Sequence, residues 1–139
     1  MARILGIDYG QKRIGLAHTD EAQLIASPLE TVSSDKIFNY LSNYFDKEDV
    51  ESIVVGEPKT LDNKPAFISQ KIKLFTKKLN KLFKKPIYMI DERFTSKIAL
   101  KTMVYLSIKK MKRREKKIID KISAAIILQS YLERKNNNI

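Results

Sequence analysis

One stretch decides the fold: Ile4-Leu5-Gly6-Ile7-Asp8-Tyr9-Gly10-Gln11-Lys12-Arg13-Ile14-Gly15-Leu16-Ala17. It predicts a strand, a tight turn and a second strand. The run from Ile4 to Ile7 is apolar on both faces, as in a central strand covered on both sides, and it ends at Asp8. Gly10 stands where a hairpin turn needs positive φ. A carboxylate at a strand end can bind a hard divalent cation or simply cap the turn, and this stretch alone favours neither.

The composition limits which kinds of site the chain can build. With 139 residues, of which 43% are hydrophobic, the chain is long enough for one domain with a sizeable core. It has no cysteine, which excludes disulfides, thiolate zinc sites and a cysteine nucleophile. Its single histidine, His18, leaves no histidine cluster for zinc and argues against a serine triad. Any metal must therefore be bound by oxygen.

The charge balance points to a polyanionic partner. Lysine and arginine number 27 against 16 acids, a formal net charge of +11 that no fold requires. Nucleic acid is the commonest partner of so basic a protein. The N-terminus enters a strand without the regions of a signal peptide, and no apolar run approaches the ~20 residues of a membrane span. We expect a cytoplasmic protein with no membrane partner, as a monomer or a weak homodimer.

The first half of the chain predicts an antiparallel meander, a helix and a buried strand. The meander comprises Arg3–Asp8, Arg13–Thr19 and a third strand from Gln23 to Pro28 or slightly beyond. His18, near the end of its strand, is expected to be a surface or packing residue. Ser33, Ser34 and Asp35 offer N-caps for a helix with apolar positions at helical spacing, Ile37, Leu41, Tyr44 and Phe45. A buried strand, Ser52–Gly56, then runs into Glu57.

The second half alternates helices with one more strand. An amphipathic helix follows Pro65, with apolar residues at Ile68, Ile72, Phe75, Leu79 and Leu82. A third buried strand, Ile87–Ile90, ends in Asp91-Glu92-Arg93. Acids thus close three apolar strands. If these strands are parallel, their carboxyl ends meet at one crevice, where ligands bind in open α/β sheets.

The last third of the chain predicts two helices with a basic run between them. The first helix carries Ala99, Met103 and Leu106, and the basic run spans 109–117. The final helix, from about Lys116 to Glu133, has two adjoining apolar stripes, and small residues around Asp120 would let it approach the sheet closely. Asp120 can reach the strand-end acids or act as a first-turn acid favoured by the helix dipole. Residues 136–139 are expected to be a frayed tail after a single domain of 1–135.

Four blocks of sequence resemble one family. They are Gly6-Ile7-Asp8-Tyr9-Gly10 with Arg13-Ile14-Gly15, then Val54-Val55-Gly56, then Asp91-Glu92-Arg93-Phe94-Thr95-Ser96, and finally Asp120 to Gln129. In this order they resemble the YqgF family of Holliday-junction resolvase homologues, also described as pre-16S ribosomal RNA nucleases. The resemblance spans nearly the whole chain. It implies a ribonuclease H-like α/β fold, with a mixed five-stranded sheet of three antiparallel strands then two parallel ones, flanked by helices.

The resemblance also implies a function and a set of site residues. The function is a metal-dependent endonuclease, with Asp8, Glu92 and Asp120 as the catalytic acids that hold Mg²⁺ or Mn²⁺. Its substrate would be structured nucleic acid, foremost the 5′ end of precursor 16S rRNA during ribosome biogenesis, with ribosomal particles as a further partner. Lys12 and Arg13 would be secondary residues that bind the phosphate. Independently of the resemblance, three cations of the basic run, Lys112, Arg113 and Arg114, are expected to bind substrate phosphates, because the run leads directly to Asp120. The alternative is a solvated loop that only aids solubility. Arg93 could orient a carboxylate.

Some residues depart from the family pattern and leave alternatives open. The loop after Val55-Gly56 commonly reads Leu-Pro in the family, whereas here it begins Glu57-Pro58-Lys59. Glu57 follows the fourth strand, where junction resolvases carry a catalytic Glu, and could join the metal shell or displace Glu92. Tyr9 could stack on a base, but packing is the favoured reading. The other functions considered are a resolvase of branched DNA, a catalytically silent nucleic-acid-binding module and, more distantly, an actin-like or sugar-kinase-like phosphotransferase.

Overall fold

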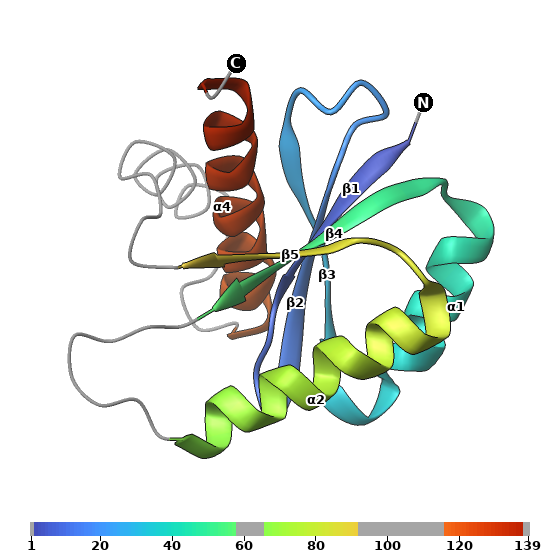
Figure 1. The fold of residues 1–139 in the computed structure, drawn as a ribbon, viewed down its shortest axis with the longest axis vertical. Helices are drawn as coiled ribbons and strands as arrows, with labels where there is room; N and C mark the ends of the chain where they lie inside the picture. The colour runs from blue at the N-terminus through green and yellow to red at the C-terminus, as the bar shows by residue number, and fades with distance from the viewer. Residues whose placement is uncertain (1, 58–65, 92–115, 138–139) are drawn as a thin grey trace.

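A computed structural model describes residues 2–57, 66–91 and 116–137 (Figure 1). In these ranges a five-stranded sheet has the strand order β3-β2-β1-β4-β5. The strands are β1 (Arg3–Asp8), β2 (Arg13–Thr19), β3 (Ala26–Ser33), β4 (Val50–Glu57) and β5 (Ile87–Asp91). The helices are η1 (Ser34–Lys36), α1 (Ile37–Lys47), α2 (Ala66–Phe83) and α4 (Lys116–Asn137).

The strand directions confirm the predicted mixed sheet. β1 pairs antiparallel with β2, and β2 pairs antiparallel with β3. β1 also pairs parallel with β4, which in turn pairs parallel with β5. The central position of β1 explains why its residues Ile4, Leu5 and Ile7 are fully buried. Both of its faces are covered, so it needs apolar residues at every position rather than at alternate ones.

Helices cover the two faces of the sheet and enclose two cores. α1 and α2 lie on one face and α4 lies on the other (Figure 1). Alternate residues of each strand point to opposite faces, so Leu5 and Ile7 join the core under α1 and α2, whereas Ile4 joins the core under α4. The helical periodicity predicted these contacts well, because the residues buried on α1 are Ile37, Leu41 and Tyr44.

The third strand begins later than predicted. It runs from Ala26 to Ser33, because Asp20 holds the preceding residues in a loop. The Oδ1 atom of Asp20 accepts hydrogen bonds from the backbone N–H groups of Leu24 and Ile25, both at 2.8 Å, and Gln23 has a positive φ of 59°. An Asp side chain that binds the backbone a few residues ahead favours a turn over a strand.

The expected side-chain N-caps of α1 are also absent. Ser34 and Asp35 instead belong to the short 3₁₀ helix η1, and neither η1 nor α1 has a side-chain cap hydrogen bond. Ser34 turns away from α1 and binds the loop between β1 and β2, as described below. The side chain that would have capped the helix is therefore used to anchor a turn.

β5 is more exposed than predicted. Of its residues only Ile90 is buried, while Tyr88 and Met89 are 46% and 43% exposed. β5 is one of the two edge strands, so among the described residues it has a hydrogen-bonded neighbour on one side alone. A short apolar run does not reveal whether a strand is central or at an edge. The prediction for Leu82 was wrong as well, because it is 51% exposed near the end of α2.

α4 packs directly against the strands, as the small residues on it predicted. A Cβ atom built on Gly6 would lie 2.8 Å from Cβ of Leu128 and 3.2 Å from the Ala124 carbonyl oxygen. A Cβ on Gly15 would overlap the carbonyl oxygen of Asp120. Both predicted stripes of α4 are represented among its buried residues, Ile122, Ala124, Ala125, Ile126, Ile127, Leu128, Ser130 and Leu132. The helix continues to Asn137, beyond the predicted end, into the segment expected to be a tail.

Candidate active site

The carboxyl ends of β1, β4 and β5 lie at the same edge of the sheet. The three strands are parallel, with Ile7 beside Val55 and Glu57 beside Asp91. Asp8 ends β1, Glu57 ends β4 and Asp91 ends β5. The parallel arrangement on which the predicted convergence depended is therefore present. An edge of this kind is where α/β sheets bind ligands.

The acids at this edge divide between the two faces of the sheet. Asp8 is two residues from Gly6 and four from Ile4, so the alternation of the strand puts it on the α4 face. Glu57 is two residues from Val55, which belongs to the core under α1 and α2, and Asp91 is its partner in register. The alternation thus directs Glu57 to the face opposite Asp8.

Asp120 of α4 lies beside the same corner of the sheet as Asp8. The link is Gly15, which pairs with Asp8 across β1 and β2 and has the Asp120 carbonyl oxygen where its side chain would be. Arg13 donates from Nε to Oδ2 of Asp120 at 2.9 Å, and the two side chains are 35% and 27% exposed. The Arg13–Asp120 ion pair therefore lies beside Gly15, the residue that pairs with Asp8, at a partly open corner of the sheet.

The turn between β1 and β2 is anchored by η1. The backbone N–H of Ser34 donates to the Lys12 carbonyl oxygen at 3.0 Å, and its Oγ donates to the Gln11 carbonyl oxygen at 2.5 Å. Gly10 does not have the predicted positive φ, since no described glycine does. Glycine is needed there for another reason, because a Cβ atom would overlap the Arg13 carbonyl oxygen. The turn thus holds Asp8 and Arg13 on rigid backbone.

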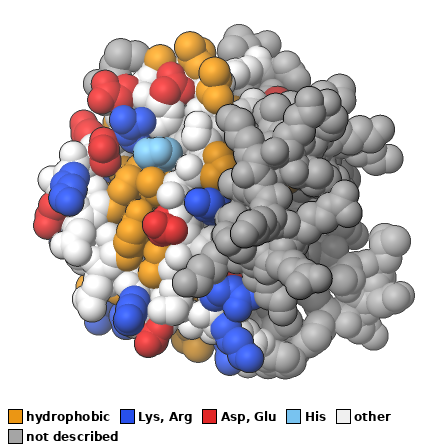
Figure 2. All heavy atoms as spheres, turned by 180° about the vertical axis from the view of Figure 1, so that it is seen from behind, with side chains coloured by type: hydrophobic (Ala, Val, Ile, Leu, Met, Phe, Trp, Pro, Cys, Tyr) orange, Lys and Arg blue, Asp and Glu red, His pale blue; other side chains and the backbone are white. Residues whose placement is uncertain are grey.

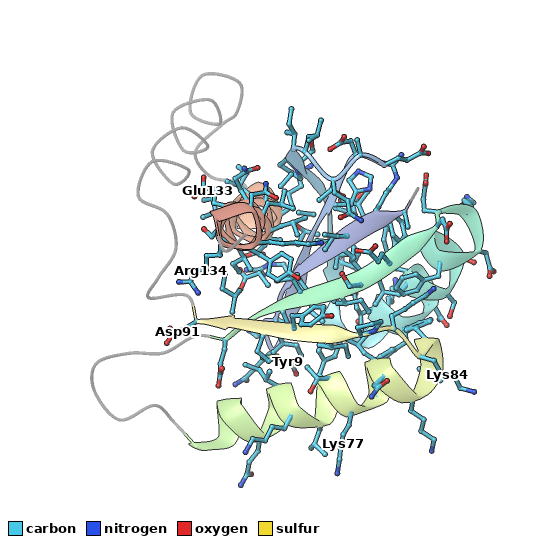
Figure 3. The ribbon with its side chains drawn as sticks, turned by 45° about the horizontal axis from the view of Figure 1, so that its top comes forward. Tyr9, Lys77, Lys84, Asp91, Glu133 and Arg134 are labelled. Carbon is cyan, nitrogen blue, oxygen red and sulfur yellow. The ribbon has the colours of Figure 1, made fainter. Side chains whose placement is uncertain are left out.

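Tyr9 packs inside the protein, as favoured from the sequence. Its ring centroid lies 4.8 Å from that of Phe75 on α2, and Tyr9 is partly buried against the core under α1 and α2. Figure 3 shows Tyr9 between the sheet and α2, with Asp91 at the end of β5. The side chains of these two consecutive residues therefore lie on opposite faces of the sheet. Tyr9 packs on the α2 face and holds the end of the strand, whereas Asp8 is on the α4 face.

Several predicted site residues lie outside the described ranges, namely Glu92, Arg93, Lys112, Arg113 and Arg114. Within those ranges no group of three or more Asp, Glu or His side chains is close enough to hold a metal ion. The two acids at the corner, Asp8 and Asp120, offer carboxylate oxygens, which are the ligands that Mg²⁺ and Mn²⁺ prefer. The donor chemistry fits such a cation, and a third acid would have to complete the site.

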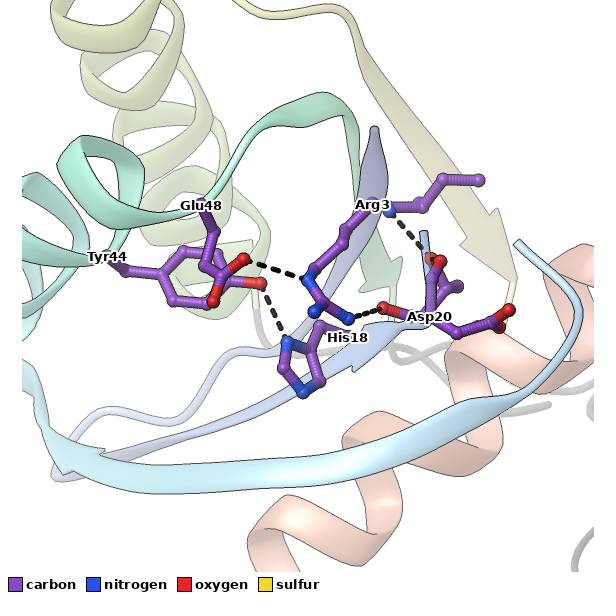
Figure 4. Close-up of polar contacts among 7 residues, drawn as sticks. Arg3, His18, Asp20, Tyr44 and Glu48 are labelled. Carbon is purple, nitrogen blue, oxygen red and sulfur yellow. Dashed lines mark hydrogen bonds and ion pairs between the residues drawn. The ribbon is translucent and has the colours of Figure 1, made fainter. Parts of the chain in front are cut away.

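A second polar cluster lies at the opposite edge of the sheet (Figure 4). Arg3 donates to Oε2 of Glu48 at 3.0 Å and to the Thr19 carbonyl oxygen at 2.8 Å. Nδ1 of His18 and the hydroxyl of Tyr44 are hydrogen-bonded at 2.8 Å. Burial lowers the pKa of His18, and the nearby Arg3 lowers it further. His18 is therefore a packing residue, one of the two roles predicted for it.

Sequence reasoning missed the ion pair between Arg13 and Asp120. The two residues are 107 positions apart, and no local sequence pattern around either residue predicts that they pair. Arg13 was predicted to bind nucleic acid, and that role stays a prediction. A hint existed in the glycine at position 15, because a strand glycine often marks the close approach of another backbone.

The sequence matches a described family over almost its whole length. The profile of the RuvX family, described as Holliday junction resolvase, matches residues 2–134. The chain belongs to the RuvX family. The resemblance to the YqgF family, another name for RuvX, is thereby confirmed.

Relatives of this RuvX chain carry the name "Putative pre-16S rRNA nuclease". The protein from Flavobacterium psychrophilum is 48% identical over 136 residues, which are 97% of this chain and 99% of the relative. The protein from Christiangramia forsetii is 48% identical over 133 residues, with 95% and 98% covered. The chain thus spans nearly the full length of both relatives.

A solved structure confirms the RuvX fold. RuvC of T. thermophilus, in complex with a Holliday junction substrate, matches with a TM-score of 0.63 and 17% identity over 96% of each chain. This likeness shows the ribonuclease H-like fold and nothing about the substrate of this chain. In the described part of the RuvX chain, no helix has the length and apolar character needed to cross a membrane.

Proposed function

We propose that this RuvX chain is a metal-dependent endonuclease of the cytoplasm that cuts the 5′ end of precursor 16S rRNA. The observation that carries the proposal is that Gly15, the register partner of Asp8, contacts the backbone of Asp120 on the α4 face of the sheet. The name of the relatives supports this substrate, and the net charge of +11 supports a nucleic-acid partner. Packing against the sheet makes the corner rigid, as catalysis requires.

Asp8, Asp120 and Glu92 would hold Mg²⁺ or Mn²⁺ at this corner. When bound, such a cation supplies an activated water and a counter-charge for the oxyanions of phosphodiester hydrolysis. Arg13 orients the Asp120 carboxylate through its hydrogen bond, and so prepares one ligand before the cation arrives. Tyr9 and the Gly15 contact fix the backbone of the two acids.

Basic side chains of this chain would bind the substrate backbone. We propose Lys12, exposed in the turn after Asp8, and the basic residues Lys112, Arg113 and Arg114 for this role. Such contacts position a nucleic acid without reading its sequence. The proposed enzyme acts as a monomer or weak homodimer, and ribosomal particles would be its further partner.

A Holliday junction resolvase is the second candidate function, because the matching family profile is described by that activity. Purified chain should cut an RNA with a precursor 16S 5′ end only with Mg²⁺ or Mn²⁺, and should leave a four-way DNA junction uncut. Both substrates are to be tested side by side, each with EDTA as the metal-free control. Metal-dependent cutting of the junction alone would replace the first function by the second. Cutting of neither would favour a silent binding module.

The two glutamates at the strand ends should differ in importance. Glu92→Gln is expected to lose at least about 10²-fold in cleavage rate, a loss of roughly 2.7 kcal/mol in transition-state stabilisation. Glu57→Gln should retain much of the rate, because strand alternation directs Glu57 to the face opposite Asp8. Single-turnover cleavage of both variants measures the difference. Severe loss in Glu57→Gln with a normal melting temperature would put Glu57 in the metal shell.

A further inference from the structure

The face of α2 that points away from the sheet carries exposed lysines. From position 66 to position 90 the chain has seven lysines and no acid. The helix buries Ile72, Phe75 and Leu79 toward the sheet. On the opposite side lie Lys73, Lys77 and Lys81, at the spacing of four residues that puts side chains in one row. We call these three residues the α2 lysine row. Figure 3 shows Lys77 on the side of the helix away from the sheet.

No acid of α2 itself stands beside the α2 lysine row to balance its charge. Three ion pairs join described residues to one another, Arg3 to Glu48, Arg13 to Asp120 and Lys135 to Glu51, and α2 takes part in none of these three. The face seen in Figure 2, around His18, carries acidic and basic side chains side by side. The α2 row differs because it concentrates cations alone. Such a surface repels itself and attracts a polyanion.

α2 contacts the strand end that carries Asp8 from the opposite face of the sheet. Tyr9, the residue after Asp8, packs on Phe75 of α2. A cavity of about 310 Å³ lies at this contact, and Lys71 and Lys78 are among its lining residues. Nζ of Lys78 lies 4.4 Å from the ring centroid of Phe38, so one edge of the cavity is cationic. Two lysines of α2 thus lie beside the residue that follows Asp8, on the face of the sheet opposite the Asp8 side chain.

We propose that the α2 lysine row binds the phosphate backbone of the RNA that flanks the cleavage site. This inference rests on the proposed nuclease function and adds a second contact surface to it. The α2 lysine row extends over eight helical steps, about 12 Å, which is enough to contact a few successive phosphates of one strand. A second copy of the chain fits this face poorly, because a two-fold interface would set lysines against lysines.

The proposal predicts a change in the salt dependence of binding. Lys73→Gln with Lys77→Gln, made in the inactive Asp8→Asn chain, should bind a labelled precursor RNA about tenfold more weakly at low salt. The slope of log affinity against log salt should flatten by about 0.7 to 0.9 for each phosphate that the variant no longer neutralises. The matched control is Lys47→Gln with Lys135→Gln, which removes the same charge at the opposite edge of the sheet and should leave the slope unchanged.

Substrate length separates this surface from the active site. An RNA trimmed to a few nucleotides around the cleavage site cannot reach α2, so its affinity should be equal in the two double variants. If both double variants gave the same slope of log affinity against log salt on the long RNA, the proposal for the α2 lysine row would be overturned. The proposed nuclease function would not be affected by that result. If the unmodified chain did not cleave the RNA but the slopes of the two double variants differed, only the proposed nuclease function would be overturned. Melting temperatures check that all variants fold.

Discussion

Asp8→Asn should reduce RNA cleavage at least about 10³-fold, equivalent to roughly 4 kcal/mol of transition-state stabilisation. Asn has nearly the same size as Asp but no charge, so it keeps the packing at the strand end and loses the affinity for a divalent cation. The fold should be preserved, because Asp8 is the last residue of β1 and is only partly buried. Single-turnover rates in Mg²⁺ and in Mn²⁺ measure the effect.

Asp46→Asn is the control for the change in charge. It removes one carboxylate from the exposed surface of α1, away from the corner of Asp8 and Asp120, and should keep the full rate. RNA binding by Asp8→Asn should stay close to that of the unmodified chain, because phosphate contacts and not the metal ligands dominate affinity. Full activity of Asp8→Asn, with normal melting, would rule out the nuclease mechanism proposed for this corner.

Gly15→Ala should destabilise the protein by about 3 kcal/mol, at the upper end for overpacking. The added methyl group would overlap the Asp120 carbonyl oxygen, which belongs to helix backbone and cannot rotate away as a side chain can. α4 must then shift from the sheet and take Asp120 with it. Misplacement of a catalytic group by about 1 Å can cost 10²-fold, so we expect a rate loss of about that size. Urea unfolding and cleavage rates give the two quantities.

Ser27→Ala is the matched control, because it places alanine at an exposed position of β3 without a new contact. Its free energy of unfolding should lie within about 0.5 kcal/mol of the unmodified chain. If Gly15→Ala were equally stable, α4 would be adjustable against the sheet. The Gly15 contact would then not be what positions Asp120.

Much of the fold followed from patterns within short segments. Unbroken apolar character identified β1 and β4 as covered strands, and helical spacing identified the faces of α1 and α4. Errors arose where a single side chain or the position in the sheet decided the outcome. Asp20 delays β3 through two hydrogen bonds, and β5 is exposed because it lies at an edge. Neither effect is visible in hydrophobic periodicity.

The part of the candidate site that follows from short segments of sequence was predictable. Asp8 stands out locally, as an acid directly after a covered strand, and the parallel strands put other acids at the same edge. Strand alternation in the structure then separates Glu57 from Asp8, which the sequence left open. The contact of Arg13 with Asp120 depends on how the last helix docks, so only the folded chain reveals it.

The close contact between Gly15 and Asp120 also determines when, during its own synthesis, the chain can complete the candidate site. Domains fold as the chain emerges, with the N-terminal part first. β1 and β2 can pair as a local hairpin early, whereas Asp120 arrives more than a hundred residues later. The proposed catalytic corner is therefore incomplete in every nascent chain that lacks α4. A newly made molecule would acquire the ability to cut RNA only in its last folding step, when this helix docks on the two glycines of the sheet.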